Sequence, residues 1–300
     1  MEQITFTGQL FQYLITGLTI GSIYAMVAIG FNIIYDVTEI INFAQGEFVM
    51  LGGLIMVMLH VTAQLPLVIA FVGTVMVVTL IGVLVDRLAI RPIRQPSVLT
   101  LIIATIAVSF ILRGIGMYFW GKDPYDLPAF SGRTPIIFFG AVIQPQYLWI
   151  MGFLVTIVCG MNLFFEKTIL GKAMKACAIN KDAAMLVGIN VNLMILLSFA
   201  FSAAIGAVAG ITITPIAFME YDRGAILAVK GFAAVILGGL GSFTGAILGG
   251  LILGVIESFG AGLISSGYKD AFALIVLLGV LFFKPSGLFG NIEISKIKRF

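Results

Sequence analysis

The sequence FVMLGGLIMVMLHVTAQLPLVIAFVGTVMVVTLIGVLV, residues 48–85, contains no Asp, Glu, Lys or Arg. A helix needs about 20 apolar residues to cross the roughly 30 Å hydrocarbon core of a lipid bilayer. This stretch is therefore long enough for two crossings, which we expect near 40–60 and 66–85.

The rest of the chain repeats this pattern. Its 300 residues are 60% hydrophobic and 10% charged, whereas a soluble domain carries about 25% charged residues. Further uncharged stretches occupy 3–35, 95–112, 134–165, 183–219, 231–256 and 271–283. We predict an all-α polytopic membrane protein with a single transmembrane domain over 1–300. Its remaining spans are expected near 10–34, 98–119, 147–165, 191–216, 229–257 and 269–284, and we read the first as a retained span rather than a secretory signal.

Basic residues predict the orientation. They gather in three groups: Arg87, Arg91 and Arg94; Lys167, Lys172, Lys175 and Lys181; and Lys284, Lys296, Lys298 and Arg299. Because basic loops stay on the cytoplasmic side, all three groups are expected there. A single span over 229–257 would leave the basic C-terminus outside, unless LGGLGSFTG, 237–245, turns the chain. We therefore expect eight to ten membrane elements, some short or broken, and a cytoplasmic C-terminus.

Glycines stand four residues apart at several points, among them Gly17 and Gly21, and Gly241, Gly245 and Gly249. In lipid, small residues at this spacing let helix backbones approach closely. We interpret these positions as packing faces, with a hinge as the alternative.

Polar side chains interrupt the apolar pattern in YDVTEIINFAQGEFVMLGG, 35–53, which contains Asn42, Gln45 and Glu47. A charge at the middle of a bilayer costs roughly 2.5–3.5 kcal/mol, so Glu47 should not face lipid. We expect a helix to begin or break here, with Asp36 and Thr38 as caps. Either the polar residues line a pore or gate, or they form an interhelical hydrogen-bond cluster in which Arg113 pairs with Glu47.

The second basic loop, EKTILGKAMKACAINKDAAMLVGINVN, 166–192, predicts two short helices. We expect Gly171 to open the first, Asn180 to cap the second with Asp182 near its N-terminus, and Gly188 to end it. Two short amphipathic helices suit docking into the groove of a partner. The alternative is a basic loop that only fixes orientation.

The chain resembles a known family in one short motif and three longer stretches. The motif DAAMLVG, 182–188, resembles the coupling loop of ABC importer permeases, because it contains Ala183, Ala184 and Gly188 at the matching positions. The segments 17–53, 171–189 and 230–257 resemble, in the right order, the branched-chain amino acid permeases of the high-affinity Leu/Ile/Val uptake system, and the chain looks more like the smaller permease subunit. Gln45 stands where the family is expected to have His, and Glu39 where it often has Gly.

The resemblance implies an ABC importer permease fold in a bacterial inner-membrane complex. The expected partners are a second permease subunit, giving a heterodimer, two cytoplasmic ATPases, an external substrate-binding protein and membrane lipid. The loop 166–190, with Lys172 and Lys175, would couple to the ATPases. This sequence has no G-x-x-x-x-G-K-[ST] motif, so we expect no ATP site, no cofactor and no enzymatic activity of its own.

The expected solute is a zwitterion with an apolar tail, Leu, Ile or Val, with other amino acids, urea or short amides as alternatives. A sparse polar set, Asn32, Asn42, Gln45 and Glu47, would give it brief contacts along the path. The competing classes are a proton- or ion-coupled secondary transporter and a passive channel.

Several other residues invite a functional interpretation that we do not favour. His60, the only histidine, is expected at the outer interface, and no metal site is indicated. Glu257 is expected to be an interfacial or packing residue. Cys159 and Cys177 are expected as free thiols, and nothing indicates a nucleic-acid partner.

Overall fold

The computed structural model describes residues 6–93, 97–132, 134–138 and 140–290. Its helices are α1 (Phe6–Thr38), α2 (Gln45–Val57), α3 (Leu67–Val85), α4 (Val98–Trp120), α5 (Pro145–Lys167), α6 (Ile169–Ile179), α7 (Lys181–Leu186), α8 (Val191–Ala217), α9 (Arg223–Gly238), α10 (Phe243–Leu263) and α11 (Lys269–Phe283). The π-helical turns η1 (Met58–Thr62) and η2 (Asp86–Ile90) extend α2 and α3, and a 3₁₀ turn, η3 (Ser266–Tyr268), precedes α11. Strands β1 (Ile136–Phe138) and β2 (Ala141–Ile143) pair antiparallel between α4 and α5.

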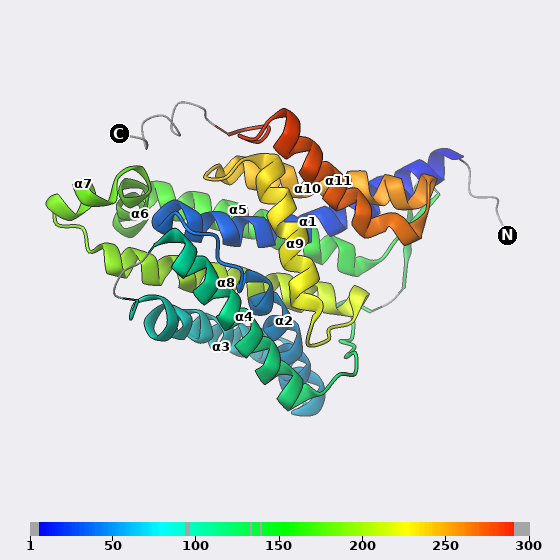
Figure 1. The fold of residues 1–300 in the computed structure, drawn as a ribbon. Helices are drawn as coiled ribbons and strands as arrows, with labels where there is room; N and C mark the ends of the chain where they lie inside the picture. Colours follow the sequence, from blue (N-terminus) through cyan, green and yellow to red (C-terminus); the bar gives the residue numbers. More distant parts are fainter. Residues whose placement is uncertain (1–5, 94–96, 133, 139, 291–300) are drawn as a thin grey trace.

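The predicted fold class is confirmed. Among the described residues, eight helical segments are long and apolar enough to cross a membrane: α1, α2 with η1, α3 with η2, α4, α5, α8, α10, and η3 with α11. The short helix α9 passes α1 obliquely and adds a ninth element (Figure 1). This number lies within the predicted eight to ten.

Burial distinguishes the central helices α1 and α2 from the peripheral ones. In α1, 72% of the residues in its most apolar window are buried, whereas the share is 22% in α4 and 17% in α5. A helix that is apolar on every side belongs in the interior, and exposed apolar faces at membrane length suit lipid. Helices α3 and α4 lie along one side of the bundle and α11 along the other (Figure 1).

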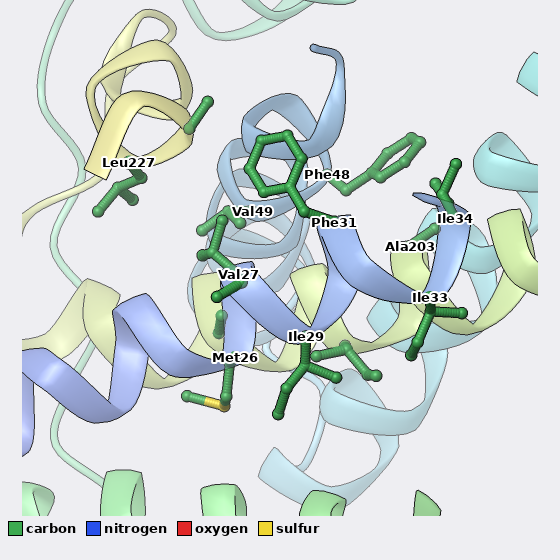
Figure 2. Close-up of a cluster of buried hydrophobic side chains, with 14 of the residues drawn as sticks. Met26, Val27, Ile29, Phe31, Ile33, Ile34, Phe48, Val49, Ala203 and Leu227 are labelled. Atoms are coloured by element: carbon green, nitrogen blue, oxygen red, sulfur yellow. The ribbon is translucent and has the colours of Figure 1, made fainter. Parts of the chain in front are cut away.

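The core is built around α1. Figure 2 shows Phe31 and Val27 of α1 beside Phe48 and Val49 of α2, with Leu227 of α9 nearby. All of these side chains belong to one buried apolar cluster. Helix α1 therefore packs against α2 and α9, and it also makes extensive contact with α10.

Glycines set the distance between α1 and α10. A Cβ placed on Gly21 would lie 2.9 Å from Gly250 O, and one on Gly17 would lie 2.7 Å from the Cα of Val255. Neither site has room for a side chain, so the two backbones touch as the four-residue spacing predicted.

The turn predicted within LGGLGSFTG is present. Helix α9 ends at Gly238 and α10 begins at Phe243. Gly239 and Gly241 have φ values of +108° and +78°, a region that residues with a Cβ rarely adopt. Gly241 therefore lies in the turn, not on a helical packing face as predicted, whereas Gly245 and Gly249 lie in α10 where it meets α9.

The two ends of the bundle can be distinguished by their contacts. Lys181 Nζ of α7 donates to Thr38 O at the end of α1, at 2.9 Å. The C-terminal segment reaches the α9–α10 turn, where Leu288 N donates to Leu237 O at 2.8 Å. We call the end that carries α6 and α7 the proximal end and the opposite end the distal end. Arg94, Lys296, Lys298 and Arg299 lie outside the described residues.

Candidate functional site

A break separates α1 from α2 at residues 39–44. Thr38 Oγ1 donates to Ile34 O at 2.6 Å and accepts from Ile40 N at 3.3 Å, so it ends α1. Asp36 also lies inside α1, and α2 starts after Ala44 without a side-chain cap. The prediction that Asp36 and Thr38 cap the second helix is therefore wrong, because α1 runs on for about one turn past the expected boundary.

Glu39 makes the sharp change of direction. Its φ is +62°, a left-handed conformation that costs a residue with a Cβ roughly 1–2 kcal/mol. Asn42 stabilises the following residues, because its Oδ1 accepts from Ala44 N at 3.1 Å. Asn42 Nδ2 is buried and has no hydrogen-bond partner among the described residues.

Gln45 is fully buried where α1, α2 and α8 meet. Its Nε2 donates to Ser202 O at 3.2 Å, and its Oε1 lies within hydrogen-bond range of Ser202 Oγ. The same hydroxyl is 2.9 Å from Gly30 O. A polar group buried in an apolar interior must be paired, and here the pairing joins three helices.

Glu47 is paired with Arg113, as predicted. Arg113 Nη2 lies 3.0 Å from Glu47 Oε1, and Ser109 Oγ donates to the same oxygen at 2.8 Å. The Glu47 side chain is 1% exposed and that of Arg113 is 26% exposed. Glu47 Oε2 and Arg113 Nε have no hydrogen-bond partner among the described residues. The pair ties α4, which is otherwise loosely packed, to the beginning of α2.

The Asn32 side chain forms hydrogen bonds with residues other than Asn42, Gln45 and Glu47. Its Nδ2 donates to Ser242 O at 2.8 Å, and its Oδ1 accepts from Gly241 N at 3.2 Å. Both bonds join α1 to the glycine-rich α9–α10 turn. The structure thus groups Asn42, Gln45 and Glu47 around the beginning of α2 and assigns Asn32 to a different contact.

A second buried charge cluster was not anticipated. Glu257 Oε1 accepts from Lys230 Nζ at 2.8 Å, and its Oε2 accepts from the Tyr24 hydroxyl at 2.9 Å. Lys230 Nζ also lies 2.6 Å from Asp270 Oδ1. Glu257 is fully buried, which fits the packing alternative of its prediction and not the interfacial one. The signal was present in the sequence, because Lys230 and Glu257 bound the uncharged stretch 231–256 and single charges in apolar segments need partners.

The loop at the proximal end forms the two predicted short helices. Thr168, not Gly171, caps α6, because its Oγ1 accepts from Gly171 N at 2.9 Å. Gly171 lies inside the helix, where a Cβ would be 2.7 Å from the Cα of Phe165. Asn180 caps α7 as predicted, with its Oδ1 accepting from Ala183 N at 2.9 Å. Gly188 follows α7 with a φ of +87°, which agrees with the predicted C-terminal glycine.

The surface of α6 and α7 carries both charge and apolar area. Lys172, Lys175, Asp182 and Ala183 are exposed, and Met185 and Leu186 are exposed by 53% and 89%. Ala184 is instead 3% exposed and packs into the body of the protein. Cys177 is buried on the inner side of α6, and burial raises the pKa of its thiol. Cys159 is exposed on α5, and both thiols are free, as predicted.

Comparison with known proteins identifies the family. The family model described as "Branched-chain amino acid transport system / permease component" matches residues 13–281. The high-affinity branched-chain amino acid transport system permease protein BraD of Pseudomonas aeruginosa is 35% identical, over 95% of this chain and 97% of BraD. The corresponding LivH protein of Escherichia coli is 32% identical, over 95% of this chain and 97% of LivH.

Among solved structures, PsaBC from Streptococcus pneumoniae in complex with Fab aligns over 97% of this chain and 94% of that chain, at 14% identity and a TM-score of 0.46. That likeness is distant, and the family assignment does not depend on it. A family match over residues 13–281, together with full-length relatives above 30% identity, shows that the chain belongs to the family of permease components of branched-chain amino acid transport systems.

Proposed function

We propose that this chain is the transmembrane permease subunit of an ATP-binding-cassette importer in a bacterial inner membrane, and that its solutes are branched-chain amino acids. The observation that carries the proposal is similarity over 95% of the chain to two proteins named as high-affinity branched-chain amino acid permeases. The proposed partners are a second permease subunit in a heterodimer, two cytoplasmic ATPases and an external binding protein.

The helices α6 and α7 are the proposed contact with the ATPases. Leu186 and Met185 expose apolar area at the proximal end, and Lys172 and Lys175 add positive charge beside it. An exposed amphipathic helix pair of this kind suits a groove on a partner protein. Ala184 belongs to the inner side of this pair, where it supports α7.

The proposed orientation puts the proximal end in the cytoplasm. Arg87 and Arg91 follow α3, and Lys172 and Lys175 lie on α6. Basic residues near the ends of membrane spans favour the cytoplasmic side. Because the described C-terminal segment contacts the α9–α10 turn near this end, we infer a cytoplasmic C-terminus.

For the polar residues around the break we favour a supporting role over a direct place in the solute path. Gln45 joins three helices, and Glu47 joins α4 to α2. Asn32 similarly connects α1 to the α9–α10 turn. Groups that hold a broken helix in place keep the route open without binding the solute tightly.

Uptake into proteoliposomes tests the function. The two permeases and two ATPases are reconstituted with ATP inside, and binding protein loaded with labelled leucine is added outside. We expect ATP-dependent uptake that unlabelled isoleucine and valine reduce by competition, and that a proton or sodium gradient does not replace. Uptake driven by such a gradient without nucleotide would support the secondary-transporter alternative, which the family assignment does not favour.

A further inference from the structure

Two adjoining cavities open at the distal end of the bundle. The larger has a volume of about 590 Å³ and the smaller about 290 Å³. Both are lined by Thr16, Ile20 and Lys269, so they form parts of one hollow, which we call the distal recess. The larger part alone falls within the roughly 300–1,000 Å³ of typical small-molecule sites.

The lining of the distal recess divides into charged and apolar parts. Arg223 and Lys269 supply positive charge and Glu220 supplies negative charge. Ile20 and Ile216 supply apolar surface beside them. This combination matches a small zwitterion that carries an apolar side chain, because each part of such a molecule has a counterpart in the wall.

The cations of this region differ in how firmly they are paired. Lys230 is buried and lies 2.8 Å from Glu257 and 2.6 Å from Asp270. Lys269 lies 3.5 Å from Glu257 and is 44% exposed. Arg223 lies 3.6 Å from Glu220 and is 37% exposed. The Arg223–Glu220 pair joins two partly exposed groups, and such pairs are weak. Lys269 is itself 44% exposed, and its ammonium group has three donors, only one of which faces the buried Glu257. Both cations therefore keep hydrogen-bonding capacity for an incoming anion.

Glu257 lines the smaller part of the distal recess, and both of its carboxylate oxygens are already hydrogen-bonded. Its two oxygens accept from Lys230 and from Tyr24 at 2.8 and 2.9 Å. Lys230 lies between the carboxylates of Glu257 and Asp270, and Lys269 lies 3.5 Å from Glu257, so the two acids face two cations before any ligand arrives. A carboxylate that enters the recess would meet Arg223 and Lys269 rather than an unpaired acid.

We propose that the distal recess binds a free α-amino acid, with Arg223 and Lys269 holding its carboxylate, Glu220 its ammonium group, and Ile20 and Ile216 its apolar side chain. This inference rests on the proposed function, since it supplies a first site on the permease for solute released by the binding protein. We expect weak binding, with a dissociation constant on the order of 1 mM, because solute has to leave the site quickly. The rival source of a carboxylate is an acidic side chain of the binding protein itself.

Protection of an introduced thiol tests the proposal. Thr16 lines both parts of the recess, so Thr16→Cys is made together with Cys159→Ser, while the buried Cys177 is kept. The complete reconstituted importer is treated from outside with a membrane-impermeant maleimide. The probes are L-leucine, L-leucinamide, which lacks the carboxylate, and unloaded binding protein. Matched variants are Arg223→Gln, Lys269→Gln and, as a control in the same distal region, Lys122→Gln.

We expect L-leucine to slow the modification several-fold and L-leucinamide to have little effect. Arg223→Gln and Lys269→Gln should each raise the leucine concentration for half-protection about tenfold, the loss expected for one charge-assisted hydrogen bond. Lys122, which is exposed and does not line the recess, should give wild-type protection as Lys122→Gln. Arg223→Lys should restore part of the protection, which separates lost charge from misfolding.

Several results would overturn the proposal. Equal protection by leucinamide would show that the recess does not recognise a carboxylate. Protection by unloaded binding protein without protection by leucine would assign the recess to protein docking. If leucine gives no protection while the same vesicles still take up leucine with ATP, the site is wrong and the proposed function stands. Absence of ATP-driven uptake in the wild-type complex would instead count against the proposed function.

Discussion

Arg113 Nη2 lies 3.0 Å from Glu47 Oε1 and so joins α4 to the start of α2 across an apolar interior. Removing one partner of a buried ion pair costs about 3–5 kcal/mol, because the other charge is left without compensation. Arg113 is 26% exposed, so we expect the lower end of that range. Both Glu47→Gln and Arg113→Gln should lower the midpoint of thermal unfolding in detergent.

The double variant distinguishes a pair from two independent contacts. If the two side chains act together, the variant that combines Glu47→Gln with Arg113→Gln should lose less free energy of unfolding than the sum of the losses of the two single variants. If the loss in the double variant equals the sum of the two single losses, the ion pair does not hold α4 against α2.

Leu186 and Ala184 lie on opposite sides of α7, with exposures of 89% and 3%. We predict that Leu186→Asp leaves the permease folded but prevents co-purification of the ATPases and abolishes uptake. Ala184→Asp should instead destabilise the permease, because it buries an unpaired charge.

Ile137→Asp is the control for the Leu186 variant, since Ile137 is a similarly exposed apolar residue in the hairpin between α4 and α5. It should retain ATPase binding. Normal ATPase binding and uptake by Leu186→Asp would remove α7 from the proposed contact.

Glu39 takes a left-handed conformation with φ +62° at the α1–α2 break. The Glu39→Gly variant should therefore have a free energy of unfolding about 1 kcal/mol higher than the Glu39→Ala variant. The comparison of Glu39→Gly with Glu39→Ala isolates the backbone effect, because both remove the same carboxylate. Equal unfolding midpoints would mean that the turn is not strained at this residue.

Gly21 and Gly114 are matched helical glycines in different surroundings. A Cβ on Gly21 would lie 2.9 Å from Gly250 O, whereas one on Gly114 would have no atom within 4 Å. Gly21→Leu should destabilise the bundle by about 1–3 kcal/mol or more through overpacking. Gly114→Leu should be neutral or slightly stabilising, because Leu favours helix more than Gly does. Similar unfolding midpoints for the two variants would contradict the close α1–α10 contact.

Much of this architecture could be predicted from charge alone. The uncharged stretches predicted the membrane spans. A cytoplasmic position for the basic C-terminus predicted a turn near 237–245, and the structure has a turn at 239–242. The cost of burying Glu47 led to Arg113, because a lone acid in an apolar segment needs a cation.

The remaining features depend on three-dimensional packing. Thr38 is a good cap by residue type, yet its hydroxyl bonds back to Ile34 O within α1. In a helix of six residues, sequence could not tell that Ala184 faces inward and Leu186 outward. Lys230 was overlooked because its partners Glu257 and Asp270 come from other helices.

We propose that this chain has no energy source of its own and is moved by ATPases that act through α6 and α7. The most direct test compares leucine accumulation in vesicles that contain the purified chain alone with vesicles that contain the complete importer and internal ATP. The account predicts accumulation above the external concentration only with the complete importer. Accumulation against the gradient by the chain alone would contradict it.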